Sequence, residues 1–136
     1  MYLDVYGRQW QGRFPFTHSG IQENVPADTN GVYMVLSGRD EQALQEAYIG
    51  IATKHNSIRA RLFSHLRGGG NWGLGRRQRP ELYSFVFFPC DDLTAAQIEG
   101  YVVTNRKPPF NVRPESVYFL SDHDQQWYCV SSITVH

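Results

Sequence analysis

The sequence predicts one α+β domain in which a small central antiparallel sheet of three strands is flanked by helices. Three short runs, at 31–36, 47–52 and 82–88, are rich in the β-branched and aromatic residues that strands favour. Two further segments carry helix-capping residues followed by helix-forming sequence. The length of 136 residues suits a single domain with a real core. We therefore expect one domain over 1–136, with its core at about 31–111.

The N-terminal segment, residues 1–30, has no clear period, and we expect it to be an arm that packs against the domain. The first predicted strand is 31–36 and the second is 47–52. Strands this close in sequence favour an antiparallel pair, which would bring Tyr33 near Tyr48. Gly50 breaks the second run and leaves a gap beside Tyr48.

The next element is a helix with its N-cap at Asn56 or Ser57, apolar residues recurring at helical spacing, and three glycines after it. Arg61 and His65 are four apart along one edge of the apolar stripe, where both side chains can reach one anion. The alternative is that they are solvated residues flanking a core face.

Residues 82–88 are apolar or aromatic almost throughout, which predicts a strand in the middle of the sheet. A second helix begins after Asp91 or Asp92 and ends before Pro108. Glu99 within it has apolar neighbours three and four residues away on either side. Its carboxylate is either a half-exposed partner of an arginine, or a metal ligand or acid-base group.

The C-terminal residues 115–136 resemble a hairpin. Cys90 and Cys129 match no metal spacing and are expected to be reduced. No apolar run reaches membrane-spanning length, and the N-terminus lacks the pattern of an export signal. We therefore expect a cytoplasmic protein without a membrane partner.

The net charge is zero, which argues mildly against a nucleic-acid-binding protein, but the charges are unevenly distributed. No acidic residue occurs from 47 to 80, and seven of the 13 basic residues lie there. Besides Arg61, the basic residues of this zone are Lys54, Arg59, Arg67, Arg76, Arg77 and Arg79. They form a candidate nucleic-acid-binding surface. The alternative is a solvated basic loop.

Five segments in this order resemble the motif set of the GIY-YIG nuclease superfamily. They are Gly31-Val32-Tyr33, Tyr48-Ile49-Gly50, the helix segment from Arg61 to His65, Glu99, and Pro108-Pro109-Phe110-Asn111. The resemblance spans residues 31–111. It implies the small antiparallel sheet described above and hydrolysis of phosphodiester bonds, most readily in DNA, with one divalent ion, Mg²⁺ or Mn²⁺.

The resemblance also implies roles for individual residues. Tyr33 and Tyr48 would be the paired active-site tyrosines, and Arg61 would contact the scissile phosphate. His65 would occupy a position held by His or Tyr in the family, Glu99 would bind the metal, and Asn111 would support the site. These groups provide what phosphodiester hydrolysis needs: proton transfer, charge neutralisation and a metal-bound carboxylate.

Two features depart from the family pattern. The intervals before and after Tyr48 are longer than usual, which surface loops tolerate at about 0.6 kcal/mol per doubling of length. Arg59 is a second candidate for the phosphate-binding arginine, although it falls within the apolar stripe.

An inactive nucleic-acid-binding domain and a protein-interaction domain remain alternatives. No added recognition module is present, so a partner protein or a homodimer is one source of specificity.

Overall fold

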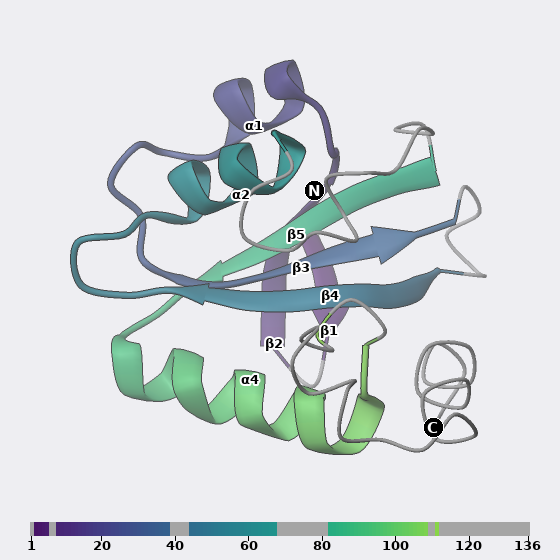
Figure 1. Cartoon of the computed structure of the whole chain (residues 1–136), viewed down its shortest axis with the longest axis vertical. Helices are drawn as coiled ribbons and strands as arrows, with labels where there is room; N and C mark the ends of the chain where they lie inside the picture. The colour runs from purple at the N-terminus through teal and green to yellow at the C-terminus, as the bar shows by residue number, and fades with distance from the viewer. Residues whose placement is uncertain (1, 6–7, 39–43, 68–81, 109–110, 112–136) are drawn as a thin grey trace.

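The computed structural model describes residues 2–5, 8–38, 44–67, 82–108 and 111. They form one antiparallel five-stranded sheet in the order β1-β2-β5-β3-β4. Helices α1 and α2 lie over one face of this sheet and α4 lies along the other (Figure 1). The predicted α+β class and antiparallel sheet are confirmed.

The three predicted strands are present as β3 (Gly31–Ser37), β4 (Gln45–Ala52) and β5 (Tyr83–Pro89). Strand β5 is the middle strand, as its continuous apolar sequence predicts, and β3 pairs with both β5 and β4. The φ angle of Gly31 is +147°, a conformation that favours glycine at the point where β3 begins.

The predicted number of strands is too small, because the N-terminal arm adds β1 (Tyr2–Val5) and β2 (Arg8–Pro15) to the sheet. Strand β2 pairs antiparallel with β5, and β1 with β2. Trp10 of β2 is fully buried. The arm is therefore part of the sheet and of its core.

The arm also contributes a helix that the sequence reading did not assign, α1 (His18–Asn24). The Oγ1 atom of Thr17 accepts a hydrogen bond from Gly20 N at 3.0 Å and caps the helix. Ile21 and Val25, four residues apart, are buried in the same cluster as residues of α2. The Thr17 cap and this spacing are the features of the sequence from which α1 could have been predicted.

The two predicted helices are confirmed as α2 (Ile58–Leu66), capped by Ser57, and α4 (Asp92–Arg106), capped by Asp91. Lys107 ends α4 in the left-handed conformation, with φ of 48°. Within the described part of the chain, no helix has the length and apolar composition needed to cross a membrane. The predicted C-terminal hairpin and Cys129 lie outside the described residues, whereas Cys90 is a free thiol at the end of β5.

Candidate active site

A buried tyrosine-histidine pair lies between the sheet and α2. Tyr33 of β3 is fully buried and His65 of α2 is 1% exposed. Tyr33 Oη and His65 Nε2 are 2.7 Å apart and share a hydrogen bond. Buried polar side chains are stabilised only when they are bonded, and this pair bonds internally. Because His65 is buried, the alternative of a solvated flank residue is excluded for it.

The space left by the absent side chain of Gly50 is filled by the ring of Tyr33. Gly50 is the register partner of Tyr33 on β4. A Cβ atom at Gly50 would lie 2.6 Å from Tyr33 Cζ and 2.9 Å from Tyr48 Cε2, too close for any side chain. The glycine therefore provides the space in which the two tyrosine rings approach each other.

Tyr48 completes an aromatic triangle with Tyr33 and His65. Its ring centroid is 6.2 Å from that of Tyr33 and 4.9 Å from that of His65, which it meets edge-on. Tyr48 is half-buried, whereas Tyr33 is fully buried. Of the two tyrosines, only Tyr48 has a surface that a bound substrate reaches directly.

Arg61 lies within electrostatic range of both tyrosines. Its pKa is raised above the ordinary arginine value, first by the charge that Tyr33 carries when ionised. Its Nε atom is buried without a hydrogen-bond partner among the described residues. Arg61 is therefore a half-buried cation beside the two hydroxyl groups.

Burial keeps both tyrosines neutral. It raises the pKa of Tyr33 far above the usual 10.0, and it raises the pKa of Tyr48 as well. The charge of Arg61 acts in the opposite direction at each hydroxyl but does not reverse the shift. At neutral pH both hydroxyls therefore retain their protons.

Glu99 reaches the site from α4, on the other side of the sheet. It is half-buried, and its negative charge contributes to the raised pKa of Tyr48. The flank of α4 that carries it faces the edge strand β4, because Arg106, seven residues further on, forms a salt bridge of 2.9 Å with Glu46 of β4. Glu99 therefore lies on the flank of α4 that faces β4, within electrostatic range of Tyr48.

Asn111 is bound to the edge of β4 beside Tyr48. Its Oδ1 accepts a hydrogen bond from Ile49 N at 3.0 Å, and its Nδ2 donates to Ile49 O at 2.8 Å. The amide thus acts as one further residue of sheet against an edge strand. It fixes the backbone between Tyr48 and Gly50.

Thr29 and Asn30, which directly precede β3, hold α2 in position. Thr29 O accepts a hydrogen bond from Ile58 N at 2.9 Å. Asn30 Nδ2 donates to Ala52 O at 3.3 Å and to Asn56 O. The start of α2 is therefore tied to the start of β3, and His65 is aligned with Tyr33. The sequence did not predict either role, because a residue that acts through contacts with backbone atoms looks like any other residue of a loop.

Comparison with protein-family models, curated proteins and solved structures finds no match to this chain. The site is therefore interpreted from its own geometry and from the sequence resemblance.

The predicted nucleic-acid-binding residues lie in different environments. Lys54 and Arg67 are exposed at the two ends of the α2 region. Arg59 faces α1 instead: its Nη2 donates to Gln22 O at 3.3 Å, and its guanidinium lies 5.9 Å from the centre of the Phe63 ring. Of the two candidate arginines, Arg61 is therefore the one beside the tyrosines. Arg76, Arg77 and Arg79 lie outside the described residues.

The residues around Glu99 fit one hard divalent ion that is shared with a substrate. Within the described ranges, no three His, Cys, Asp or Glu side chains gather into a metal site. Mg²⁺ commonly binds through one or two carboxylates, with water and substrate phosphates completing its shell. The single carboxylate of Glu99 near Tyr48 agrees with this mode of binding.

Proposed function

We propose that this protein is an endonuclease that hydrolyses phosphodiester bonds in DNA with one divalent metal ion. The observation that carries the proposal is the convergence, around β3, β4 and α2, of the buried Tyr33–His65 hydrogen bond with Arg61 and Tyr48, with Glu99 in electrostatic range of Tyr48. The sequence resemblance to the GIY-YIG superfamily supports the same activity. The cytoplasm is the proposed location.

Arg61 binds the scissile phosphate in this proposal. Its side chain is only half-buried, and charge-assisted hydrogen bonds to phosphate are strong. Its raised pKa keeps the guanidinium charged at any pH at which DNA is a substrate. It therefore neutralises a non-bridging oxygen as negative charge develops.

The tyrosines handle the proton of the attacking water. Tyr48 accepts a hydrogen bond from that water, since it is the tyrosine with exposed surface. Because burial keeps both hydroxyls protonated, a proton taken from water must be passed on. As Tyr48 takes a proton from the water it gives its own to Tyr33, and Tyr33 gives its own to His65 Nε2, 2.7 Å from its Oη, when that nitrogen carries no proton.

Glu99 holds the ion. A bound Mg²⁺ or Mn²⁺ supplies Lewis-acid stabilisation of phosphate charge. The half-buried position of Glu99 limits its contact with water, and Glu99 belongs to α4 whereas Arg61 belongs to α2, on the opposite face of the sheet.

The test is incubation of the purified protein with duplex, single-stranded and branched DNA and with RNA, in Mg²⁺, in Mn²⁺ and in EDTA. We expect cleavage of DNA that requires the ion and disappears in EDTA. The variant Glu99→Gln keeps the side-chain shape and removes the charge, so cleavage should fall by about 10³-fold while DNA binding changes little. Glu23→Gln, an exposed carboxylate on α1, is the matched control.

Undiminished cleavage in EDTA, or full activity of Glu99→Gln, contradicts the proposed metal role. Binding to DNA without cleavage of any substrate favours the inactive nucleic-acid-binding domain, and absence of both favours a protein-interaction domain. If cleavage shows no structural preference, a partner protein or a second copy of this chain is the proposed source of specificity.

A further inference from the structure

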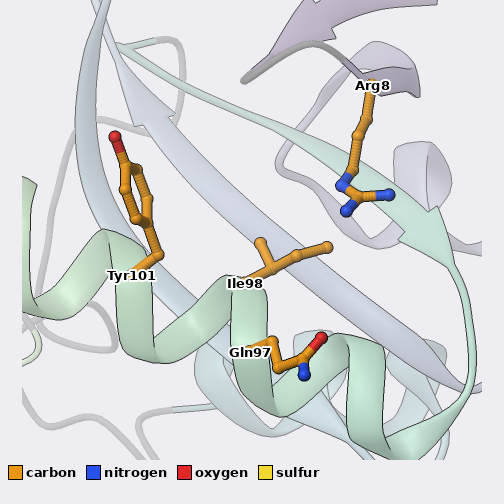
Figure 2. A pocket seen from close by; sticks show the side chains of 4 residues that line it. All are labelled: Arg8, Gln97, Ile98 and Tyr101. Carbon is orange, nitrogen blue, oxygen red and sulfur yellow. The ribbon is translucent and has the colours of Figure 1, made fainter.

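A second site lies on the opposite flank of α4 from Glu99. A hollow of about 410 Å³ forms where the first residue of β2 faces this helix. Among the described residues, Arg8, Gln97, Ile98 and Tyr101 line it, and Figure 2 shows the Arg8 guanidinium directed toward Ile98 and Gln97, with the Tyr101 ring rising from the helix on the other side. Small-molecule sites begin at about 300 Å³, so this volume holds a compact ligand.

The four side chains differ in chemistry. Arg8 is exposed and carries the cation, and Gln97 offers both a hydrogen-bond donor and an acceptor. Ile98 is 8% exposed and forms an apolar floor, while Tyr101 is 56% exposed and presents an aromatic ring. A ligand that matches all four has a flat ring with polar edges and an attached anion.

Arg8 is held in place by the aromatic ring of Phe88. Its guanidinium lies 5.7 Å from the centre of the Phe88 ring, and that ring is 5.8 Å from the ring of the buried Trp10. This cation–π contact restricts the side chain without neutralising its charge. Arg8 is therefore positioned to bind an anion at one end of the hollow.

Helix geometry separates this hollow from the candidate active site. Gln97 and Tyr101 are four residues apart and share one flank of α4, whereas Glu99 lies on the flank that faces β4. The helix between them is about 10 Å thick. A ligand in the hollow does not occupy the position of the scissile phosphate.

We propose that this hollow binds a nucleotide, with the base against Tyr101 and Ile98, its edge hydrogen-bonded to Gln97, and its phosphate on Arg8. Bases stack on aromatic side chains, and arginine binds phosphate through two parallel hydrogen bonds. The nucleotide is either a free nucleoside monophosphate or one unpaired residue of a nucleic-acid strand. This inference does not depend on the nuclease proposal.

The test is titration by calorimetry, in EDTA, with 2′-deoxyadenosine 5′-monophosphate and with a single strand of ten deoxyadenosines. Deoxyadenosine and inorganic phosphate are probes for the base alone and the anion alone. We expect the monophosphate to bind more tightly than either part. Arg8→Gln and Tyr101→Ala should each weaken it by about tenfold, which corresponds to one good stacking or phosphate contact.

Two further variants distinguish recognition from folding or bulk charge. Arg8→Lys keeps the charge but loses the planar fork, so it should retain more affinity than Arg8→Gln. Gln22→Ala, at an exposed position on α1 over the opposite face of the sheet, should bind like the parent. Circular dichroism and thermal unfolding verify that each variant is folded.

If the strand binds and Arg8→Gln or Tyr101→Ala weakens its binding, a nucleic acid is the source of the nucleotide. If only the monophosphate binds, the source is a free nucleotide. Both results support the site. The inference is overturned if neither probe binds, if Arg8→Gln and Tyr101→Ala bind like the parent, or if inorganic phosphate competes as well as the nucleotide. A protein that binds the nucleotide but cuts no DNA contradicts only the nuclease proposal.

Discussion

The two faces of the sheet are made by the same strands but bury different kinds of side chains. The face under α1 and α2 is rich in aromatic residues and includes Tyr33, with the buried His65 against it. The face under α4 is mainly aliphatic, with Met34 and Ile49 among its buried residues.

This difference separates the residues that stabilise the fold from the residues proposed to carry out the chemistry. A buried imidazole and phenol lose their hydration, and hydrogen bonds such as the one they share offset that loss, so they add little net stability. Buried aliphatic side chains contribute about 1.5–3 kcal/mol each and have no reactive group. Consecutive residues of β3, Tyr33 and Met34, point to the two faces, so substituting each in turn tests the proposed chemistry and the stability of the fold separately.

The largest expected effect is on cleavage by Tyr33→Phe. The substitution removes one hydroxyl and leaves the ring packed over Gly50. Loss of an acid-base group costs about 10²–10⁴-fold in rate, so cleavage should fall within that range while DNA binding persists. The control is Tyr83→Phe, a half-buried tyrosine on β5. Equal rates for both variants would remove Tyr33 from the mechanism.

The matching change on the other face is Met34→Ala. Met34 is fully buried, so truncation should lower the free energy of unfolding by about 2–5 kcal/mol in urea denaturation. Below the melting temperature, the cleavage rate per folded molecule should stay near that of the parent. A large loss of rate in the folded variant would mean that the two faces are coupled and that the division proposed here is wrong.

The sequence predicted most of the framework from local patterns. Strands β3, β4 and β5 and helices α2 and α4 follow from β-branched runs, caps at Ser57 and Asp91, and the stop before Pro108. Strands β1 and β2 were missed because an edge extension gains its stability from pairing with β5, which a local pattern does not contain. Helix α1 has only seven residues, so the Thr17 cap and the Ile21–Val25 spacing were a weak signal for it.

The sequence predicted which residues belong to the candidate site, but not how they are arranged. Tyr33, Tyr48, Arg61 and His65 are brought together around β3, β4 and α2. The sequence did not predict that His65 is buried or that Gly50 makes room for Tyr33, because both follow from the register between strands and the position of α2. It also gave no reason to separate Arg59 from Arg61 beyond the helical wheel.

A smaller effect on stability is expected for Gly50→Ala. The added methyl group would meet Tyr33 Cζ at 2.6 Å and Tyr48 Cε2 at 2.9 Å. Overpacking of this kind costs about 1–3 kcal/mol, and it should displace Tyr33 from His65. Cleavage should fall more than the loss of stability explains. The control is Gly100→Ala on α4, where an added Cβ meets nothing within 4 Å and should raise helix stability slightly.

The smallest expected effect is a pH dependence of stability that belongs to Tyr33. Burial raises the pKa of its hydroxyl above the ordinary 10.0 of an unfolded chain. Above pH 10 the unfolded tyrosine releases its proton while the folded one retains it, so the folded state binds more protons and its stability falls as pH rises. This contribution is complete below pH 10, and about 1 kcal/mol of it is lost by pH 11.

The measurement is urea denaturation of the parent and of Tyr33→Phe at intervals from pH 8 to pH 11. Tyr33→Phe starts lower by about 1–3 kcal/mol, because His65 loses its bonded partner, but it lacks the ionisable group. The free energy of unfolding of the parent should therefore fall more steeply above pH 10, and the two curves should converge. Other tyrosines titrate in both proteins and cancel in the difference. Parallel curves would show that Tyr33 ionises as readily in the folded state as in the unfolded chain, and that its hydroxyl is not held in the protonated form that the proposed proton transfer requires.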